Sequence, residues 1–278
     1  FPVYTLSKRA PSTTRPPLQI SLSIIDHSLH YIFILKYKLL MNISIVIPTF
    51  KEKENIKNLI NLIKSEIEIS KIIVVDDSPS EEIKNEISNF NDVKYIYRGK
   101  KLGRGSAIIE GLNFSQENFN SEIFIEMDAD LSHDPKELKE NLKLFKKNNC
   151  DLLISSRYLK ESKIINWSIQ RKIFSFLANL LAKFLLKIPV TDYTNGYRIY
   201  SKSAVQHIRK NCGNIGDGFI ILSEVLVELY YNNFKIHETS SKFVNRTRGE
   251  SSVNLNEIIK SLLGLIKIYK LKNKIKQK

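Results

Sequence analysis

Two aspartates, Asp128 and Asp130, lie one residue apart directly after an apolar run at 123–125. Carboxylates this close repel one another unless a cation lies between them. Oxygen ligands of this kind suit Mg²⁺ or Mn²⁺, and these ions keep open positions for phosphate oxygens. The pair therefore predicts a divalent metal that holds a phosphorylated ligand. The alternative is a turn without chemistry, because turns favour aspartate.

Short apolar runs alternate with amphipathic segments from Met41 to about Ser155. Strands are expected at 43–47, 71–75, 93–97, 122–127 and 151–155, and helices at 55–67, 80–90, 103–114 and 135–147. This alternation predicts a parallel sheet with helices on both faces. Ligands of such sheets bind beyond the carboxyl ends of the strands, where Pro48, Asp77 and Asp128 all fall.

Other polar residues near these strand ends are interpreted as structural. Asp134 is expected to cap the following helix, with Pro135 in its first turn. Gly103 and Gly105 are expected to allow a tight turn from strand to helix. His133 is not expected to be a ligand.

Two amphipathic segments mark the second half of the chain. The segment 166–187 has a wide apolar face, and its longest charge-free stretch, 173–182, is too short to span a bilayer. Its narrow polar stripe consists of Lys172, Ser175, Asn179, Lys183 and Lys187. Such a helix can lie in a membrane interface or pack as a core helix under the sheet, and the pattern fits both. A basic amphipathic helix is also expected at 253–278, where it suits anionic lipid.

The charge of the chain predicts an anionic partner. Lys and Arg number 43 against 29 Asp and Glu, which gives a formal net charge of +14. Nucleic acid, an acidic membrane surface and a phosphorylated ligand all fit, as does a lysine-rich surface without functional meaning. Cys150 and Cys212 lack metal-site spacing, which indicates reduced thiols in a cytosolic compartment.

Residues 1–40 differ in composition from the rest of the chain. They contain no methionine, whereas Met41 directly precedes the first strand pattern. We expect a disordered segment, or an upstream extension of a protein whose native start is Met41. A membrane anchor is the rival interpretation, but Asp26, His27 and Lys36 interrupt the apolar run.

Six segments in order carry a family resemblance: IVIPTFKEKENI, VVDDSPS, KLGRGSAIIEG, MDADLSHDP, SSRY and NRTRGESS. Over about 42–267 the chain resembles dolichyl-phosphate mannose synthases and their relatives among the family 2 glycosyltransferases. The resemblance implies a GT-A fold, an α/β Rossmann-like nucleotide-binding sheet with helices on both faces, plus amphipathic interfacial helices. It implies a domain at 41–252, with a nucleotide-sugar half at 41–160 and an acceptor half at 161–252.

The resemblance also implies the reaction and its location. A sugar, in the first place mannose from GDP-mannose, would pass with inversion to dolichyl or another polyprenyl phosphate. The enzyme would be a peripheral protein on the cytoplasmic face of a membrane, with a membrane-anchored partner subunit as a further possibility. The acceptor phosphate is mostly ionised at neutral pH, so the reaction needs no general base.

On the donor side, the resemblance assigns nucleotide and sugar contacts to a set of residues at the strand ends. They are Pro48, Phe50, Glu52, Val75, Asp77, Asp128, Ala129, Asp130 and Asp192. Asp128, Asp130 and Ser132 would hold the metal, Mg²⁺ or Mn²⁺. Phe50 stands where the family usually has tyrosine, and Ser132 where some relatives have glutamine.

On the acceptor side, the resemblance assigns phosphate contacts to Arg157, Arg171, Ser175, Arg246 and Arg248. Arg171 and Ser175 are four residues apart and share a helical face. The final motif ends in serine where the family often has lysine, and Arg248 could compensate. Asp130, Arg157 and Arg246 are the predicted catalytic residues.

Two competing functions remain open at this level. The same fold could use another donor, such as UDP-glucose or UDP-GlcNAc, because sugar choice depends on pocket shape. A non-catalytic nucleic-acid-binding protein would fit the positive charge, but it gives no reason for an aspartate pair at a strand end. We therefore expect no nucleic-acid partner.

Overall fold

The computed structural model describes residues 42–69, 71–216, 218–245 and 255–277, with the side chains of the last range described from Leu263 onward. The expected extension at 1–40 and the predicted phosphate ligands Arg246 and Arg248 lie outside these ranges. Within them, Cys150 and Cys212 are buried free thiols.

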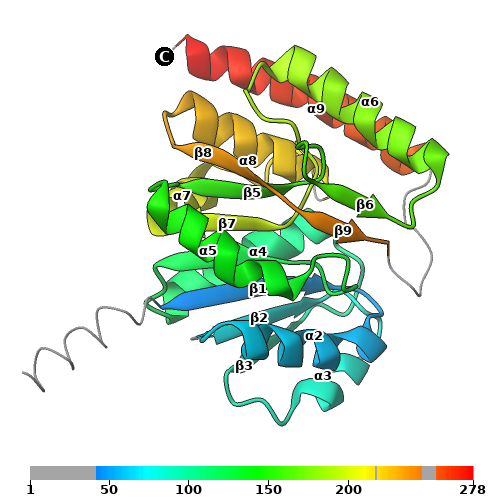
Figure 1. Ribbon diagram of the computed structural model, residues 1–278, viewed down its shortest axis with the longest axis vertical. Helices are drawn as coiled ribbons and strands as arrows, with labels where there is room; N and C mark the ends of the chain where they lie inside the picture. Colours follow the sequence, from blue (N-terminus) through cyan, green and yellow to red (C-terminus); the bar gives the residue numbers. More distant parts are fainter. Residues whose placement is uncertain (1–41, 70, 217, 246–254, 278) are drawn as a thin grey trace, which may run out of the picture. The chain divides into compact units, whose positions relative to one another are not determined.

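A seven-stranded sheet forms the centre of the described chain, in the order β3-β2-β1-β4-β7-β5-β8 (Figure 1). The bounds are β1 Ile43–Thr49, β2 Lys71–Asp76, β3 Val93–Tyr97, β4 Ile123–Glu126, β5 Leu152–Ser156, β7 Arg198–Ser201 and β8 Ile236–Ser240. The five strands expected from the sequence are confirmed. β6 (Lys163–Ile165) and β9 (Lys242–Val244) form a separate parallel pair.

The prediction of a parallel sheet is wrong for β7, which runs antiparallel to both β4 and β5. Its direction follows from where the chain enters it. Asp192, six residues before the strand, lies against Arg157 at the carboxyl end of β5. A strand that starts at this edge must run back across the sheet, and antiparallel pairing needs no crossover helix.

Helices cover both faces of the sheet, as predicted. On one face lie α4 (Arg104–Asn118), α7 (Lys202–Asn211) and α8 (Ile220–Tyr231). On the other lie α2 (Lys53–Glu66), with α3 (Glu82–Ile87) beside it, and α5 (Leu138–Lys147) after the short helix η1 (Pro135–Glu137). The spacing that predicted α2 is that of its buried residues, Ile56, Leu59, Ile60 and Ile63.

Local signals set the helix starts nearest to the carboxyl edge. The Asp134 side chain accepts the N–H of Lys136 at 3.1 Å, with Pro135 in the first turn, so the predicted cap is confirmed. Gly103, before α4, has a φ of +107°, a conformation that side-chain-bearing residues rarely adopt. The predicted tight turn therefore depends on this glycine.

α6 (Ile169–Leu186) and α9 (Leu255–Lys276) lie side by side, and α9 also packs on α8 (Figure 1). The last carbonyls of α6 are capped by its neighbours. Lys272 Nζ of α9 donates to the oxygen of Leu185 at 2.7 Å, and the Tyr231 hydroxyl of α8 donates to that of Leu186 at 2.6 Å. In the described residues, no helix has the length and apolarity needed to span a bilayer.

α6 turns its apolar side outward. Ile169 and Phe184 are 76% and 75% exposed, while Asn179 and Ala182 face the protein and are buried. The exposed large apolar side chains of α6 are Ile169, Ile173, Phe174, Phe176, Leu177, Leu180, Leu181 and Phe184, and we call them the α6 apolar face. A core helix under the sheet would bury these side chains, so that alternative does not fit.

Candidate active site

Four segments bring predicted site residues to the carboxyl edge of the sheet. Pro48 lies near the end of β1 and pairs in register with Val75 of β2, whose side chain is part of the core. Asp77 directly follows β2, and Arg157 directly follows β5. Asp128 lies two residues after β4. The edge predicted from the sequence is thus where these residues meet.

A cleft of about 550 Å³ opens between the β1–α2 connection and the residues after β2. Glu52 lines it, directly precedes α2 and accepts a hydrogen bond from Asn55 Nδ2 at 2.7 Å. Near it in the chain, the half-buried Phe50 ring has Lys51 Nζ and Lys101 Nζ at 5.5 and 5.0 Å from its centroid. An aromatic ring with two nearby cations suits a base linked to phosphates.

Asp77 is held by the protein itself. Its Oδ1 accepts from Arg98 Nε at 2.5 Å, and its Oδ2 accepts the N–H groups of Leu102 and Gly103 at 2.9 and 2.8 Å. These bonds fix the turn between β3 and α4. The base or ribose contact predicted for Asp77 would have to involve carboxylate oxygens that already accept these hydrogen bonds.

Asp128 lies beside an arginine that sequence reasoning did not single out. Arg104, the first residue of α4, donates from Nε to Asp128 Oδ1 at 2.8 Å and from Nη1 to Glu126 Oε1 at 2.6 Å. Burial alone would raise the pKa of the Asp128 carboxyl, but the Arg104 guanidinium outweighs it. The pKa of Asp128 therefore lies below its ordinary value, and the side chain is ionised at neutral pH.

The loop after Asp128 is shaped by its own polar groups. Asp130 Oδ1 accepts the N–H of Ser132 at 3.0 Å, and Leu131 between them has a φ of +62°. The N–H of Asp128 donates to His133 Nδ1 at 3.1 Å. These bonds place both aspartates on one short turn. His133 acts there as a structural acceptor.

The residues at this turn fit a divalent ion of the predicted kind. Asp128 and Asp130 supply hard carboxylate oxygens, and the buried Ser132 Oγ has no hydrogen-bond partner among the described residues. Buried hydroxyls normally have a partner, which an ion or a phosphate oxygen would provide here. Across the described ranges, no group of three acidic, histidine or cysteine side chains could hold a metal alone. Phosphate oxygens or water would therefore complete the coordination.

Arg157 forms a buried, bidentate ion pair with Asp192. Its Nε and Nη2 each donate to one carboxylate oxygen at 2.8 Å, and Nη2 also donates to Thr194 Oγ1 at 2.7 Å. Burial alone would raise the pKa of Asp192, but the Arg157 guanidinium outweighs it and holds that pKa below its ordinary value. Nη1 makes no hydrogen bond with the described residues, so it is the atom of Arg157 that can meet an anion.

The turn at 192–195 links Arg157 to the acid pair. Asn195 Oδ1 lies 3.1 Å from His133 Nε2, and His133 Nδ1 accepts the N–H of Asp128. Because Nδ1 accepts, the ring hydrogen lies on Nε2, and burial lowers the pKa of His133 so that the ring is neutral. After Arg104, the charge of Arg157 also lowers the pKa of Asp128. The acids and this guanidinium therefore share one electrostatic environment.

The inner face of α6 contacts the same turn. Ser175 Oγ accepts from the hydroxyl of Tyr158, the neighbour of Arg157, at 2.6 Å. Asn179 Nδ2 donates to Thr194 Oγ1 at 3.3 Å. Part of the polar stripe thus faces the candidate site, and α6 is hydrogen-bonded to the segments on both sides of the Arg157 ion pair.

Arg171 and Arg157 both lie against one indole ring. The Arg171 and Arg157 guanidinium carbons lie 4.2 and 5.5 Å from the Trp167 ring centroid. Arg171 Nη1 also donates to Asn245 Oδ1 at 2.8 Å. Asn245 directly precedes Arg246, which lies outside the described residues. The structure thus brings together the two described arginines that were assigned to the acceptor.

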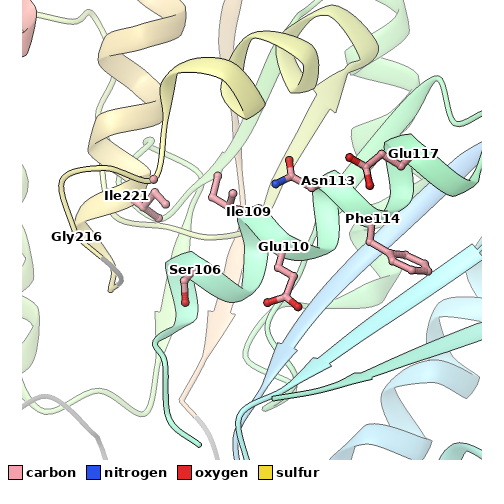
Figure 2. A pocket seen from close by; sticks show the side chains of 9 residues that line it. Ser106, Ile109, Glu110, Asn113, Phe114, Glu117, Gly216 and Ile221 are labelled. Atoms are coloured by element: carbon pink, nitrogen blue, oxygen red, sulfur yellow. The ribbon is translucent and has the colours of Figure 1, made fainter. Parts of the chain in front are cut away.

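A second cavity, of about 340 Å³, lies against α4 and includes none of the predicted site residues (Figure 2). Ile109 and Ile221 contribute apolar walls, and Glu110 and Glu117 approach it from α4. Both carboxylates already have cationic partners in Arg98 and Arg209. The cavity offers little to recognise a charged ligand.

Sequence reasoning missed four residues that hold the site: Arg104, His133 as a support, Trp167 and Asn195. One signal for Arg104 was present in the sequence. A cation in the first turn of a helix is disfavoured by the helix dipole, so its position there indicates a nearby acidic partner. His133 and Asn195 meet across 62 positions, which a local pattern cannot reveal.

The chain belongs to glycosyl transferase family 2, whose family model matches residues 44–209, more than half of its length. This membership makes the protein a glycosyltransferase, as the motifs predicted.

Curated relatives cover most of the chain. It is 32% identical over 242 residues to a dolichol-phosphate mannosyltransferase of Pyrococcus furiosus, a match that covers 84% of this chain and 66% of that protein. It is 28% identical over 219 residues to a polyprenol monophosphomannose synthase of Mycolicibacterium smegmatis, covering 77% of this chain and 82% of that one. An undecaprenyl-phosphate mannosyltransferase of Micrococcus luteus is also 28% identical over 219 residues, covering 77% and 88%.

Solved structures confirm the predicted GT-A fold. Glucosyl-3-phosphoglycerate synthase from Mycobacterium tuberculosis, crystallised with Mn²⁺, UDP-glucose and phosphoglyceric acid, matches with a TM-score of 0.62. The match covers 84% of this chain and 82% of that one at 15% identity. Its complex with Mn²⁺, UDP and glucosyl-3-phosphoglycerate matches with a TM-score of 0.60 at 16% identity, covering 85% and 81%. At this identity the likeness concerns the fold alone.

Proposed function

We propose that the protein transfers mannose from GDP-mannose to dolichyl or another polyprenyl phosphate, with inversion, at the surface of a membrane. One observation carries the proposal. The acid pair at the end of β4 and the Arg157–Arg171 pair are joined through the turn at 192–195, next to a helix with an exposed apolar face. The named activities of the three curated relatives support the choice of sugar and acceptor.

On the donor side, the chain would bind a nucleotide sugar along the carboxyl edge. Phe50 and Glu52 would contact the base, and Asp128 and Asp130 would face the diphosphate. A divalent ion, when bound, would neutralise charge on the departing diphosphate. The two aspartates and Ser132 would hold this ion, with Mg²⁺ and Mn²⁺ both suited to oxygen ligands.

On the acceptor side, arginines would hold an anion that is already nucleophilic. A phosphate monoester is mostly ionised at neutral pH, so no side chain has to remove a proton. Arg157 Nη1 and Arg171 would orient the phosphate oxygen in line with the anomeric carbon through charge-assisted hydrogen bonds. Ser175, Arg246 and Arg248 are proposed to complete this anion site.

The α6 apolar face would let the enzyme meet a lipid-borne phosphate. Large apolar side chains gather on one side of α6, and the same helix contacts Tyr158 and Thr194 on its other side. Contiguous exposed apolar surface of this kind marks membrane or protein interaction sites. We place the protein at the cytoplasmic surface of a membrane, with or without a membrane-anchored partner.

A donor screen tests the proposed reaction. Purified protein is incubated with Mn²⁺, a polyprenyl phosphate and GDP-mannose, UDP-glucose or UDP-GlcNAc in turn, and the glycolipid is measured. We expect product with GDP-mannose because the relatives are named as mannosyltransferases. If product formed only with a uridine nucleotide sugar, the enzyme would use a donor other than GDP-mannose. If no donor gave product, the proposal of a polyprenyl phosphate acceptor would be refuted.

The α6 apolar face is expected to bind lipid vesicles. Replacing Phe174 and Phe184 with glutamate removes apolar area worth about 1.5–3 kcal/mol per side chain on full burial and adds negative charge. The double variant should therefore lose most of its co-sedimentation with vesicles that contain phosphatidylglycerol, with no change in Tm. Tyr97→Glu, an exposed aromatic on β3, is the matched control and should sediment like the wild type. Unchanged sedimentation of the double variant would exclude this face as the lipid contact.

A further inference from the structure

An acidic cluster of Glu126 and Asp128 lies at the carboxyl end of β4, and Arg104 contacts both carboxylates from α4. Besides the two hydrogen bonds described above, Arg104 Nη2 lies 2.6 Å from Asp128 Oδ1. This nitrogen is buried and has no hydrogen-bond partner among the described residues. The N–H groups of Nη2 therefore remain available as hydrogen-bond donors.

The Arg104 contacts give the two oxygens of Asp128 different surroundings. Oδ1 accepts a hydrogen bond from Nε and lies in ionic contact with Nη2. Oδ2 lies 3.9 Å from His133 Nε2, beyond hydrogen-bond distance. Oδ2 is therefore the Asp128 oxygen that can coordinate a cation. Asp128 would bind such an ion through this one oxygen.

The guanidinium of Arg104 is held from several sides. Glu126, which anchors Nη1, is itself fixed by the hydroxyl of Tyr200 at 2.6 Å on the neighbouring strand β7. The Phe219 ring lies with its centroid 5.3 Å from the guanidinium carbon. A Cβ added at Gly196 would collide with the guanidinium, so this glycine makes the space that Arg104 occupies.

The charges in the cluster explain why a cation is needed there. The carboxylates of Glu126 and Asp128 repel the diphosphate of a nucleotide sugar, and a divalent ion held by the two aspartates would leave the charge of Glu126 uncompensated. Arg104 supplies the missing positive charge at a position that the dipole of α4 disfavours. The side chain is 12% exposed, so its charge is weakly screened.

We propose that Arg104 is a positioning residue for the donor site, an inference that rests on the proposed function. It directs Asp128 Oδ2 toward the metal and balances the acidic cluster so that the site accepts a metal-bound nucleoside diphosphate. Its loss should weaken the binding of that complex, and a lysine should restore part of the binding because it keeps the charge without the forked geometry.

Calorimetric titration of GDP in the presence of Mn²⁺ tests the inference without measuring turnover. Loss of a partner that orients a metal ligand typically costs about 10–100-fold in affinity, and we expect a loss in this range for Arg104→Met. Arg104→Lys should fall between Arg104→Met and the wild type. Arg209→Met removes an arginine whose ion pair with Glu117 lies outside the site, and it should bind like the wild type.

Gly196→Ala provides a second route if Arg104→Met does not fold. It keeps the charge of Arg104 but displaces the guanidinium, so it should also weaken GDP binding with Mn²⁺. If Arg104→Met bound GDP with wild-type affinity, the inference would be overturned and the proposed function would stand. If Arg104→Met does not fold, wild-type affinity of Gly196→Ala would have the same meaning. Failure of the wild type itself to bind GDP with Mn²⁺ would instead refute the proposed nucleotide donor, and the inference with it.

Discussion

Replacing Asp130 with alanine is expected to lower kcat/KM for glycosyl transfer by about 10³-fold, the upper range for loss of one group that stabilises charge in a transition state. Asp130 shares one turn with Asp128, and its carboxylate accepts the N–H of Ser132, whose hydroxyl has no hydrogen-bond partner among the described residues. Its loss would remove one of the two aspartates proposed to hold the divalent ion. Initial rates at saturating Mn²⁺, with GDP-mannose and polyprenyl phosphate, measure the effect.

Asp134→Ala on the same loop is the matched control for Asp130→Ala. It removes the cap of η1, which costs about 1 kcal/mol of stability, but it takes no part in the proposed metal site. We expect near-normal kcat/KM with a small decrease in Tm. Equal activity of Asp130→Ala and Asp134→Ala would contradict the role of Asp130 as a metal ligand.

Replacing Arg157 with methionine is expected to impair both folding and catalysis. Asp192 is 0% exposed, so the variant leaves a buried carboxylate without its partner, which costs about 3–5 kcal/mol of unfolding free energy. The arginine proposed to hold the acceptor phosphate is lost as well, and kcat/KM for the lipid should fall by at least about 10²-fold. Denaturant titration and initial-rate kinetics measure the two effects separately.

Arg157→Lys separates the structural role of Arg157 from its role toward the acceptor. Lysine keeps a positive charge beside Asp192, so most of the stability should remain, but it cannot bond Asp192 and a phosphate together. The KM for the polyprenyl phosphate should rise while the KM for GDP-mannose stays near the wild-type value. If only the KM for GDP-mannose rose, Arg157 would not be part of the acceptor site.

The positions of the donor-side residues could be predicted because local patterns determine where strands end. Apolar runs closed by Pro48, Asp77 and the Asp128–Asp130 pair define the carboxyl edge without knowledge of tertiary structure. The antiparallel β7 could not be predicted in this way, because its direction depends on where the 192–195 turn lies in space. The Arg157–Asp192 pairing likewise joins residues 35 positions apart.

The outward apolar face of α6 shows a second limit of sequence reasoning. A periodic pattern identifies the helix and its two faces but not which face meets the protein. The usual expectation, polar residues outward, is reversed at Ser175 and Asn179, which bond Tyr158 and Thr194. Only the surrounding partners reveal this reversal, and they come from segments that the sequence pattern did not place beside α6.

The capping of α6 by Lys272 has a consequence for experimental design. Because this C-terminal side chain closes the last turn of α6, shortening the chain before Lys272 would remove basic surface and also release the end of the helix that supports Tyr158. If the proposed function holds, a truncated protein would lose membrane affinity and acceptor binding together. Point substitutions at exposed lysines such as Lys274, which leave the cap in place, are the sounder way to ask what the tail contributes by its charge.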